Sequence, residues 1–224
     1  MELLHIFHTK KKRTAKDLNR RSARKSPYST ILIVCEGEKT EVKYFKEFIK
    51  FHRLNTANVK VLSSKKGSAP INVIEFAIET AESQEGIYKV YCVWDRDNHE
   101  SYERALDKIK NHKSKRKAKS KPRYQAIVSL PCFEIWLLLH FTFTSKPYTP
   151  TEKHSPCDNV IIDLRQYLSH YAKNSNDLYE QLSEHTEVAI QNGDRLKEYN
   201  LQSNSSNPAT DVHELIRDLK SLTT

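Results

Sequence analysis

The sequence has no long apolar run and no Cys-x-x-Cys pair. No stretch approaches the roughly 18 apolar residues that a transmembrane helix requires, and residues 1–12 lack the apolar core of a secretory signal. We therefore expect a cytoplasmic protein that does not enter a membrane. The 4 cysteines are widely separated, which argues against a zinc ribbon and against a disulfide framework. We expect reduced thiols at all of them: Cys35, Cys92, Cys132 and Cys157.

Positive charge is concentrated in two segments. Of the net charge of +9, residues 1–25 contribute +7 and residues 108–123 contribute +9, so the remaining chain is acidic, at −7. Such segments either stay solvated and keep a protein soluble, or bind phosphate backbones by releasing counterions. Two of them beside an acidic site favour nucleic acid, DNA or RNA, as the partner. The candidate contacts are Lys10, Lys11, Lys12, Arg13, Lys113, Lys115, Arg116, Lys117, Lys119 and Lys121.

Strands and helices alternate in the first two thirds of the chain. Residues 31–35 form an apolar run that is typical of a strand buried on both faces. Thr40 can cap the helix that follows. Alternation of this kind implies a parallel sheet with right-handed crossovers and helices on both faces. The predicted strands are 31–35, 59–62, 88–94 and 124–130, and the predicted helices are 40–54, 70–85 and 99–111.

The last third of the chain has a different pattern. Pro131 is expected to open a buried apolar helix containing residues 133–141. An extended loop to residue 158 and two helices, 159–171 and 177–191, should follow, with Gly193 ending the second helix. A polar loop at 200–207 precedes a final helix at 211–222, in which Asp211 and Glu214 have the spacing of a capping box. We thus expect three parts: a basic arm (1–29), an α/β domain (30–141) and a loop and helical subdomain (142–224).

Acidic residues follow the first and third predicted strands. Glu36 ends the first strand, and Asp95 and Asp97 follow the third. If these strands are neighbours, the carboxylates converge at the carboxyl edge of the sheet, where α/β proteins bind ligands. Crowded carboxylates raise one another's pKa, and Mg²⁺ or Mn²⁺ would relieve that repulsion. Such an ion can activate water or stabilise the leaving oxygen of a phosphodiester. Glu38 and Glu41 are further candidate ligands.

Three other residues, Glu134, Lys39 and Arg96, could have either a functional or a structural role, and a fourth, His140, is expected to be structural. Glu134, inside an apolar helix, is either a structural acid with a partner or a further catalytic group, because its helix starts just beyond the fourth strand. Lys39 and Arg96, next to the acids, either contact the scissile phosphate or are surface counter-charges. His140 is expected to be a satisfied core histidine. The group His154, Cys157 and Asp158 is a poor zinc site.

The Glu36-Gly37 pair and the later Asp95-Arg96-Asp97 resemble the two acidic motifs of the Toprim domain, a fold of topoisomerases, primases and nucleases. The sequence has a closer resemblance to the RloB family, which is linked to phage resistance and restriction loci. The segments that resemble it are 33–41, Tyr44-Phe45, 93–97, 129–141, 207–210 and Val212-His213.

This resemblance implies a Toprim-like, Rossmannoid α/β fold with a C-terminal helical extension, used in abortive anti-phage defence. It implies a metal-dependent nuclease, often paired with a separate ATPase. Glu36, Asp95 and Asp97 carry over as metal or acid-base groups. Glu41 is the candidate for a further metal ligand, although it lies one residue later than in the simplest form of the motif. Zinc-binding cysteines of a primase and room for topoisomerase domains are both lacking.

Two functions follow. The first is a nuclease that cleaves DNA or RNA, tRNA included. The second is a catalytically silent Toprim scaffold that binds nucleic acid or an ATPase as a regulatory subunit. The sequence leaves open the number of metal ions, the choice between monomer and homo-oligomer, and whether activity needs a partner.

Overall fold

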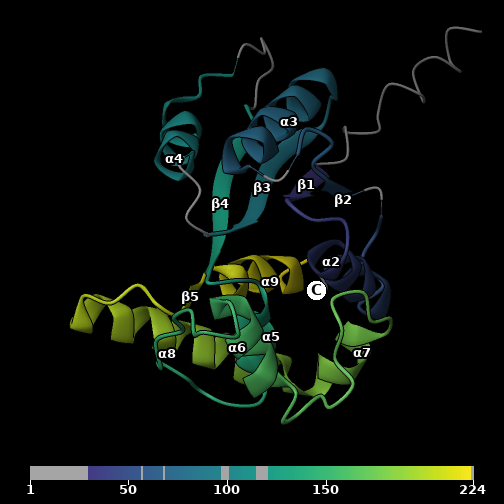
Figure 1. Ribbon diagram of the computed structural model, residues 1–224. Coiled ribbons are helices and arrows are strands. Elements are labelled where there is room, and N and C mark those ends of the chain that lie inside the picture. Colours follow the sequence, from purple (N-terminus) through teal and green to yellow (C-terminus); the bar gives the residue numbers. More distant parts are fainter. Residues whose placement is uncertain (1–29, 57, 68, 97–100, 115–120, 223–224) are drawn as a thin grey trace, which may run out of the picture.

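A computed structural model describes residues 30–56, 58–67, 69–96, 101–114 and 121–222. Its centre is a five-stranded sheet of order β2-β1-β3-β4-β5 (Figure 1). The first four strands are parallel, and β5 pairs antiparallel with β4. The mostly parallel α/β sheet confirms the predicted fold class, and β1 and β3 are neighbours, which is the condition for their acids to converge. The strands are β1 (Thr30–Cys35), β2 (Val59–Ser63), β3 (Ile87–Asp95), β4 (Arg123–Leu130) and β5 (Ala209–Thr210).

Helices cover both faces of this sheet. In β1 every residue is buried, and alternate side chains enter two separate cores. Ile31 and Ile33 pack with α2, α5, α8 and α9, whereas Leu32 and Val34 pack with α3 and α4. The helices are α2 (Thr40–Phe51), α3 (Pro70–Ser83), α4 (Tyr102–Asn111), α5 (Glu134–Leu138), α6 (Pro156–Leu164), α7 (Leu178–Leu182), the 3-10 turn η1 (Ser183–His185), α8 (Thr186–Ser203) and α9 (Val212–Lys220).

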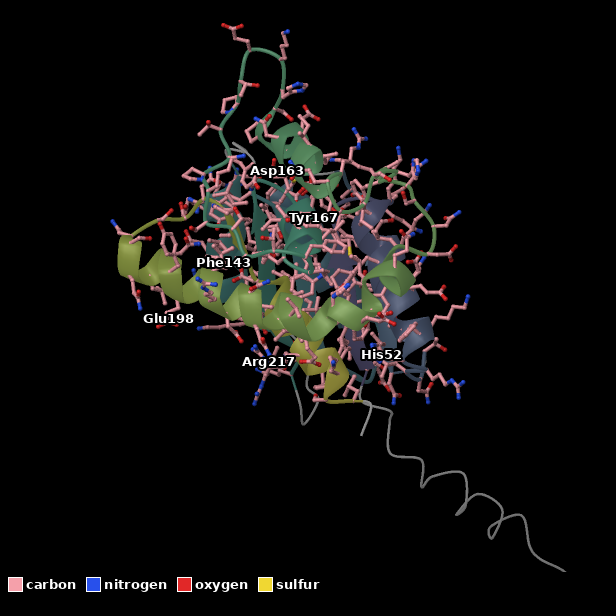
Figure 2. All side chains as sticks on the ribbon, turned by 90° about the horizontal axis from the view of Figure 1, so that it is seen from below. His52, Phe143, Asp163, Tyr167, Glu198 and Arg217 are labelled. Carbon is pink, nitrogen blue, oxygen red and sulfur yellow. A yellow bond between two sulfur atoms is a disulfide. The ribbon has the colours of Figure 1, made fainter. Side chains whose placement is uncertain are left out.

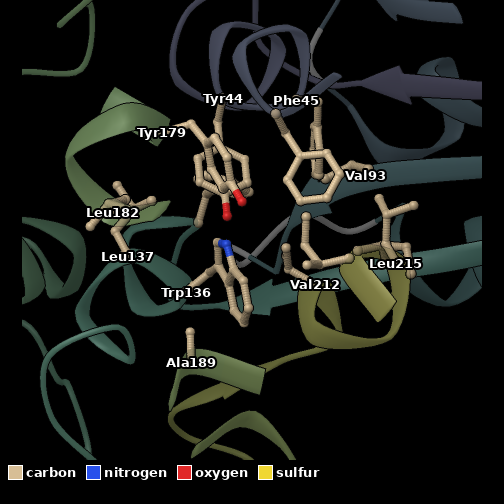
Figure 3. Packing of buried hydrophobic residues seen from close by; sticks show 14 of the residues in the cluster. Tyr44, Phe45, Val93, Trp136, Leu137, Tyr179, Leu182, Ala189, Val212 and Leu215 are labelled. Carbon is tan, nitrogen blue, oxygen red and sulfur yellow. The ribbon is translucent and has the colours of Figure 1, made fainter. Parts of the chain in front are cut away.

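An aromatic cluster joins α2 to α5 and α7. The Tyr44 ring meets those of Phe133 and Tyr179 edge to face, with centroids 5.5 and 5.3 Å apart. Figure 3 shows the Tyr44 and Tyr179 rings above the indole of Trp136. Such contacts contribute about 0.5–1.5 kcal/mol each beyond burial. The cluster therefore fixes the start of α2 relative to the start of α5.

The segment after β4 is buried as predicted, but its helix is shorter. Pro131 lies in a bend before a turn that the Ile135 N–H closes by donating to the Cys132 carbonyl (3.1 Å), and α5 begins only at Glu134. The helix ends at Leu138, and α6 then begins at Pro156, three residues earlier than predicted, with a capping box between Ser155 and Asp158. These boundaries depend on turn geometry that apolar periodicity does not report.

Gly193 does not end a helix, which corrects the prediction. The predicted helix at 177–191 is divided into α7, η1 and α8, and α8 continues through Gly193 to Ser203. A Cβ at Gly193 would lie 2.7 Å from Cγ of His213 in α9, so this glycine allows two helices to approach closely. Figure 2 shows α8 running across this side of the molecule, with exposed Glu198 on its outer surface.

The C-terminal segment completes the sheet. Thr210 of β5 pairs with Ser129 of β4, a short strand that the sequence did not predict. The predicted capping box of the last helix is absent: Asp211 accepts a hydrogen bond from the Val128 N–H (3.2 Å) instead. The tertiary contact has therefore displaced the local one. Among the described residues, no helix is long and apolar enough to cross a membrane.

Cys132 and Cys157 form a disulfide, which corrects the expectation of four reduced thiols. Their Cα atoms are 5.7 Å apart, and the bond (yellow in Figure 2) joins the turn before α5 to the first turn of α6. Cys35 and Cys92 are free and buried. The two bonded cysteines are 25 residues apart in sequence, and such spacing does not reveal an approach created by folding.

Candidate active site

The ends of β1 and β3 bring two predicted acids together. Glu36 follows β1, and its N–H donates to the Val93 carbonyl at 2.9 Å, which extends the parallel ladder by one residue. Its Oε2 accepts a hydrogen bond from the N–H of Asp95, the last residue of β3, at 3.1 Å. The prediction that these residues meet at the carboxyl edge of the sheet is confirmed.

A pocket of about 420 Å³ lies at this edge. Four segments contribute to it: the turn from β1 into α2, the end of β3, the start of α5, and the loop between α6 and α7. Its lining residues are Glu36, Gly37, Glu38, Lys39, Thr40, Glu41, Asp95, Phe133, Glu134 and Lys173. The acids of three predicted segments therefore share one cavity.

Glu41 folds back over the turn that precedes its helix. An atom at the Cβ position of Gly37 would lie 3.1 Å from Oε2 of Glu41, so the missing side chain leaves room for this carboxylate. Burial raises the pKa of Glu41, and Glu134 raises it further, while the Lys173 ammonium lowers it. Glu38 also lines the pocket but is exposed.

Asp95 has the most crowded carboxylate environment of the pocket. Burial raises its pKa well above the ordinary value. Repulsion from Glu41, Glu134 and Glu36 adds to this rise, whereas the Lys173 ammonium lowers the pKa. The pocket thus stores electrostatic repulsion that a bound cation would relieve.

Glu134 is a buried, partnered acid that also lines the pocket. Its side chain is 2 % exposed, yet it lines the pocket. The Tyr171 hydroxyl donates to its Oε1 at 2.8 Å, and Nζ of Lys173 lies 3.8 Å from the same oxygen. Oε2 faces Sγ of Cys157 at 3.5 Å. Glu134 is therefore a partnered acid whose orientation is fixed beside the other carboxylates.

Tyr171 and Lys173 are site residues that the sequence analysis missed. The loop that carries them is tied to α2: Thr40 Oγ1 donates to the Lys173 carbonyl at 2.7 Å, and Lys43 Nζ donates to the Asn174 carbonyl at 2.6 Å. The prediction that Thr40 caps α2 is wrong. The N-cap position is Lys39, and the Thr40 hydroxyl donates to the Lys173 carbonyl instead. No local signal could reveal a lysine that lies 39 residues in sequence from Glu134 and further from the other acids of the pocket.

The remaining predicted side chains lie in different places. Lys39 is exposed and lines the pocket. Arg96 does not line it, and its guanidinium carbon lies 4.6 Å from the centroid of the Tyr102 ring. His140 is a neutral core residue, since burial lowers its pKa to about 4. Asp97 lies outside the described residues.

The described part of the basic loop lies at the other edge of the sheet. Lys113 and Lys121 are exposed, and Lys121 leads into the start of β4 at Arg123. The 8 residues of β4 separate that point from the acidic edge by about 23 Å. The other candidates lie outside the described residues: Lys10, Lys11, Lys12, Arg13, Lys115, Arg116, Lys117 and Lys119.

The carboxylates of the pocket suit a hard cation held partly through water. They offer only oxygen ligands, which Mg²⁺ and Mn²⁺ prefer, and their repulsion favours a positive charge between them. Glu36, Glu41 and Asp95 are not so close that all three ligand atoms lie within 4.8 Å of one another. Mg²⁺ usually keeps several waters, which can bridge such spacing.

A comparison with protein-family models matches residues 31–219 to the family described as RloB-like protein. Neither a curated protein nor a solved structure matches the chain.

Proposed function

The chain belongs to the RloB-like family, and on this premise we propose that it is a divalent-metal-dependent nuclease that hydrolyses phosphodiester bonds of DNA or RNA in anti-phage defence. The observation that carries the proposal is the junction of β1 and β3, where Glu36 and Asp95 are hydrogen bonded in one pocket with Glu41 and Glu134. Acids whose pKa values are raised by burial and by one another in a cleft are candidates for a functional site.

Glu36, Glu41 and Asp95 would hold the ion, with Asp97 as a further candidate ligand. A Mg²⁺ or Mn²⁺ ion bound there would supply an activated water and neutralise charge on the phosphate. Removal of this repulsion is the reason that a cation would bind, since the carboxyls of Glu41 and Asp95 resist ionisation without one.

The other residues of the pocket have complementary roles. Lys39 and Lys173 offer ammonium groups that would bind the scissile phosphate. Glu134, with one oxygen held by Tyr171, would orient a water or accept its proton. A base held in one orientation by a second residue is the usual requirement for such a step.

The nucleic acid would extend beyond the pocket. If Lys121, which leads into β4, contacts the same molecule, the contact lies about 23 Å from the acids, so the bound nucleic acid would run along the sheet. The proposal includes an ATPase partner, which the family resemblance implies, and leaves the choice between monomer and homo-oligomer open.

A substrate panel tests the proposal. The purified chain is incubated with plasmid, single-stranded DNA and a tRNA pool, in Mg²⁺, in Mn²⁺ and in chelator, and the cleaved ends are mapped. We expect cleavage of at least one substrate only when the metal is present. Absence of cleavage with every substrate, both alone and with the cognate ATPase, would contradict the proposal.

One observation favours a silent, nucleic-acid-binding scaffold as the second candidate. The Glu36, Glu41 and Asp95 ligand atoms are not gathered within 4.8 Å, and Lys173 already pairs with Glu134. A scaffold predicts salt-sensitive binding of nucleic acid with no cleavage, and no effect of Mg²⁺ on the thermal stability of the protein.

A further inference from the structure

Beside the acidic pocket, two sulfurs and a carboxylate converge. We propose that Cys132, Glu134 and Cys157 form a binding site for a thiophilic divalent cation, represented by Zn²⁺, once the disulfide is reduced. The site shares Glu134 and Lys173 with the acidic pocket, and its test does not depend on nuclease activity. Within the described residues, no other set of three His, Cys, Asp or Glu side chains brings all of its ligand atoms within 4.8 Å of one another.

The geometry needs little change to accept the ion. Zn²⁺ binds cysteine sulfur at about 2.3 Å and carboxylate oxygen at about 2.1 Å, so tetrahedral ligand atoms lie roughly 3.5–3.8 Å apart. Sγ of Cys157 is already 3.5 Å from Oε2 of Glu134. The Cα atoms of Cys132 and Cys157, 5.7 Å apart, let the two sulfurs separate to this spacing by side-chain rotation. Tyr171 occupies Oε1 of Glu134, which leaves Oε2 facing the sulfurs.

The charges of the site balance in both states. Two thiolates and the Glu134 carboxylate carry three negative charges, which Zn²⁺ and the Lys173 ammonium neutralise together. Nζ of Lys173 lies 3.6 Å from Sγ of Cys157 and 3.8 Å from Glu134. In the oxidised state Lys173 and Glu134 neutralise each other. Because Cys132 and Glu134 are each 2 % exposed, net charge there would be costly, and neither state has any.

The exchange between the two states is a two-electron reaction. A dithiol reductant attacks the Cys132–Cys157 bond and becomes a cyclic disulfide, and the cysteines gain two electrons and two protons. Zn²⁺ then displaces the two thiol protons into solvent. The partly exposed Cys157 and Lys173 give the ion a route of entry. Three protein ligands leave the fourth position for water.

Cobalt spectroscopy tests the site in the full chain. The protein is reduced with a dithiol, freed of it without oxygen, and titrated with Co²⁺, whose bonds to thiolates absorb in the near ultraviolet. We expect one equivalent of Co²⁺ to produce the thiolate band, Zn²⁺ to displace it, and the oxidised chain to show none. Absence of the band in the reduced chain would overturn the proposal.

Two variants and a control locate the ligands. Cys157→Ser should lose the band, and Glu134→Gln, which keeps both thiols, should weaken Zn²⁺ binding at least tenfold. Cys92→Ala, which removes a buried free thiol from β3, should leave both measurements unchanged. Circular dichroism is used to check that each variant is folded. A band that persists in folded Cys157→Ser, or unchanged affinity in Glu134→Gln, would contradict the assignment. Neither result depends on nuclease activity, so failure here leaves the proposed function intact.

Discussion

The Glu36 carboxylate accepts a hydrogen bond from the backbone N–H of Asp95 at 3.1 Å, and this contact joins the ends of two adjacent parallel strands. The contact orients one acid by means of the backbone of the other, so neither residue depends on a flexible loop for its place. Glu41 and Glu134, from the first turns of two helices, face the same pocket. The aromatic contacts between Tyr44 and Phe133 hold those helices together.

Asp95→Asn should stabilise the metal-free protein. The substitution keeps the size of the side chain and removes the charge that Glu41, Glu134 and Glu36 repel. Each unit by which the pKa of a carboxyl is raised corresponds to about 1.4 kcal/mol of unfavourable ionisation. Thermal unfolding in chelator at neutral pH should therefore give a higher Tm for the variant than for the wild type. The matched control is Asp107→Asn, at an exposed position of α4, which should leave Tm unchanged. A lower Tm for folded Asp95→Asn would mean that the aspartate is structurally required.

The contribution of Glu41 and Asp95 to the stability of the metal-free protein should fall as pH rises. The pKa values of Glu41 and Asp95 are raised in the folded state, so the fold binds more protons than the unfolded chain does. Their contribution is fully present below the unfolded pKa, about 4, and is lost as pH rises through the folded values. Mg²⁺ binds the ionised form, so the Tm difference between Mg²⁺ and chelator should widen with pH. If the Tm difference between Mg²⁺ and chelator stays constant from about pH 5 to about pH 8, these two acids do not bind the metal.

Gly37→Ala should impair the site with little effect on stability. The new Cβ would lie 3.1 Å from Oε2 of Glu41, the far end of a flexible side chain that can move by a few tenths of an ångström. The expected stability change is below about 1 kcal/mol, whereas Mg²⁺ affinity, measured by calorimetry, should fall. The test lies in the double variant with Glu41→Gln. Since both changes act through the same carboxylate, their effects should not add. Full additivity would show that Gly37 acts in another way.

Tyr171→Phe should destabilise the protein by about 1–3 kcal/mol, because it removes a hydrogen bond to a buried carboxylate. Lys173→Met removes the half-exposed cation beside the buried Glu134 carboxylate, so it should also lower stability, and it should weaken nucleic-acid binding. Denaturant unfolding and fluorescence anisotropy separate the two effects. Lys146→Met, which breaks the surface pair with Asp163, is the matched control and should leave nucleic-acid binding unchanged. Equal loss of binding in both lysine variants would indicate a general charge effect.

Gly193→Ala should cost about 1–3 kcal/mol by overpacking, because its Cβ would meet the His213 ring at 2.7 Å between α8 and α9. Gln191→Ala, at an exposed position of the same helix, is the control. If the glycine variant proves as stable as this control in denaturant unfolding, the two helices can separate without penalty.

The described strands and helices between residues 30 and 130 follow their sequence pattern closely because each of them carries its own apolar period. That pattern also placed Glu36 and Asp95 at one edge of the sheet, since parallel strands end together. The chain after Leu130 was harder to predict. Glycine is typical of a helix end, but Gly193 lies inside α8, where it allows close contact with His213 of α9. The Asp211 carboxylate accepts a hydrogen bond from Val128 of β4 and does not cap its own helix. The partners of Glu134, which are Tyr171, Lys173 and Cys157, come from segments that only folding brings near.

The most direct test of the nuclease proposal is cleavage by Asp95→Asn beside the Asp107→Asn control, on the substrate that the wild type cuts, in Mg²⁺ and in chelator. The account predicts that the control cuts as the wild type does, only with Mg²⁺, and that folded Asp95→Asn loses cleavage by at least about 100-fold. Wild-type levels of cleavage by Asp95→Asn, or cleavage that survives the chelator, would contradict it.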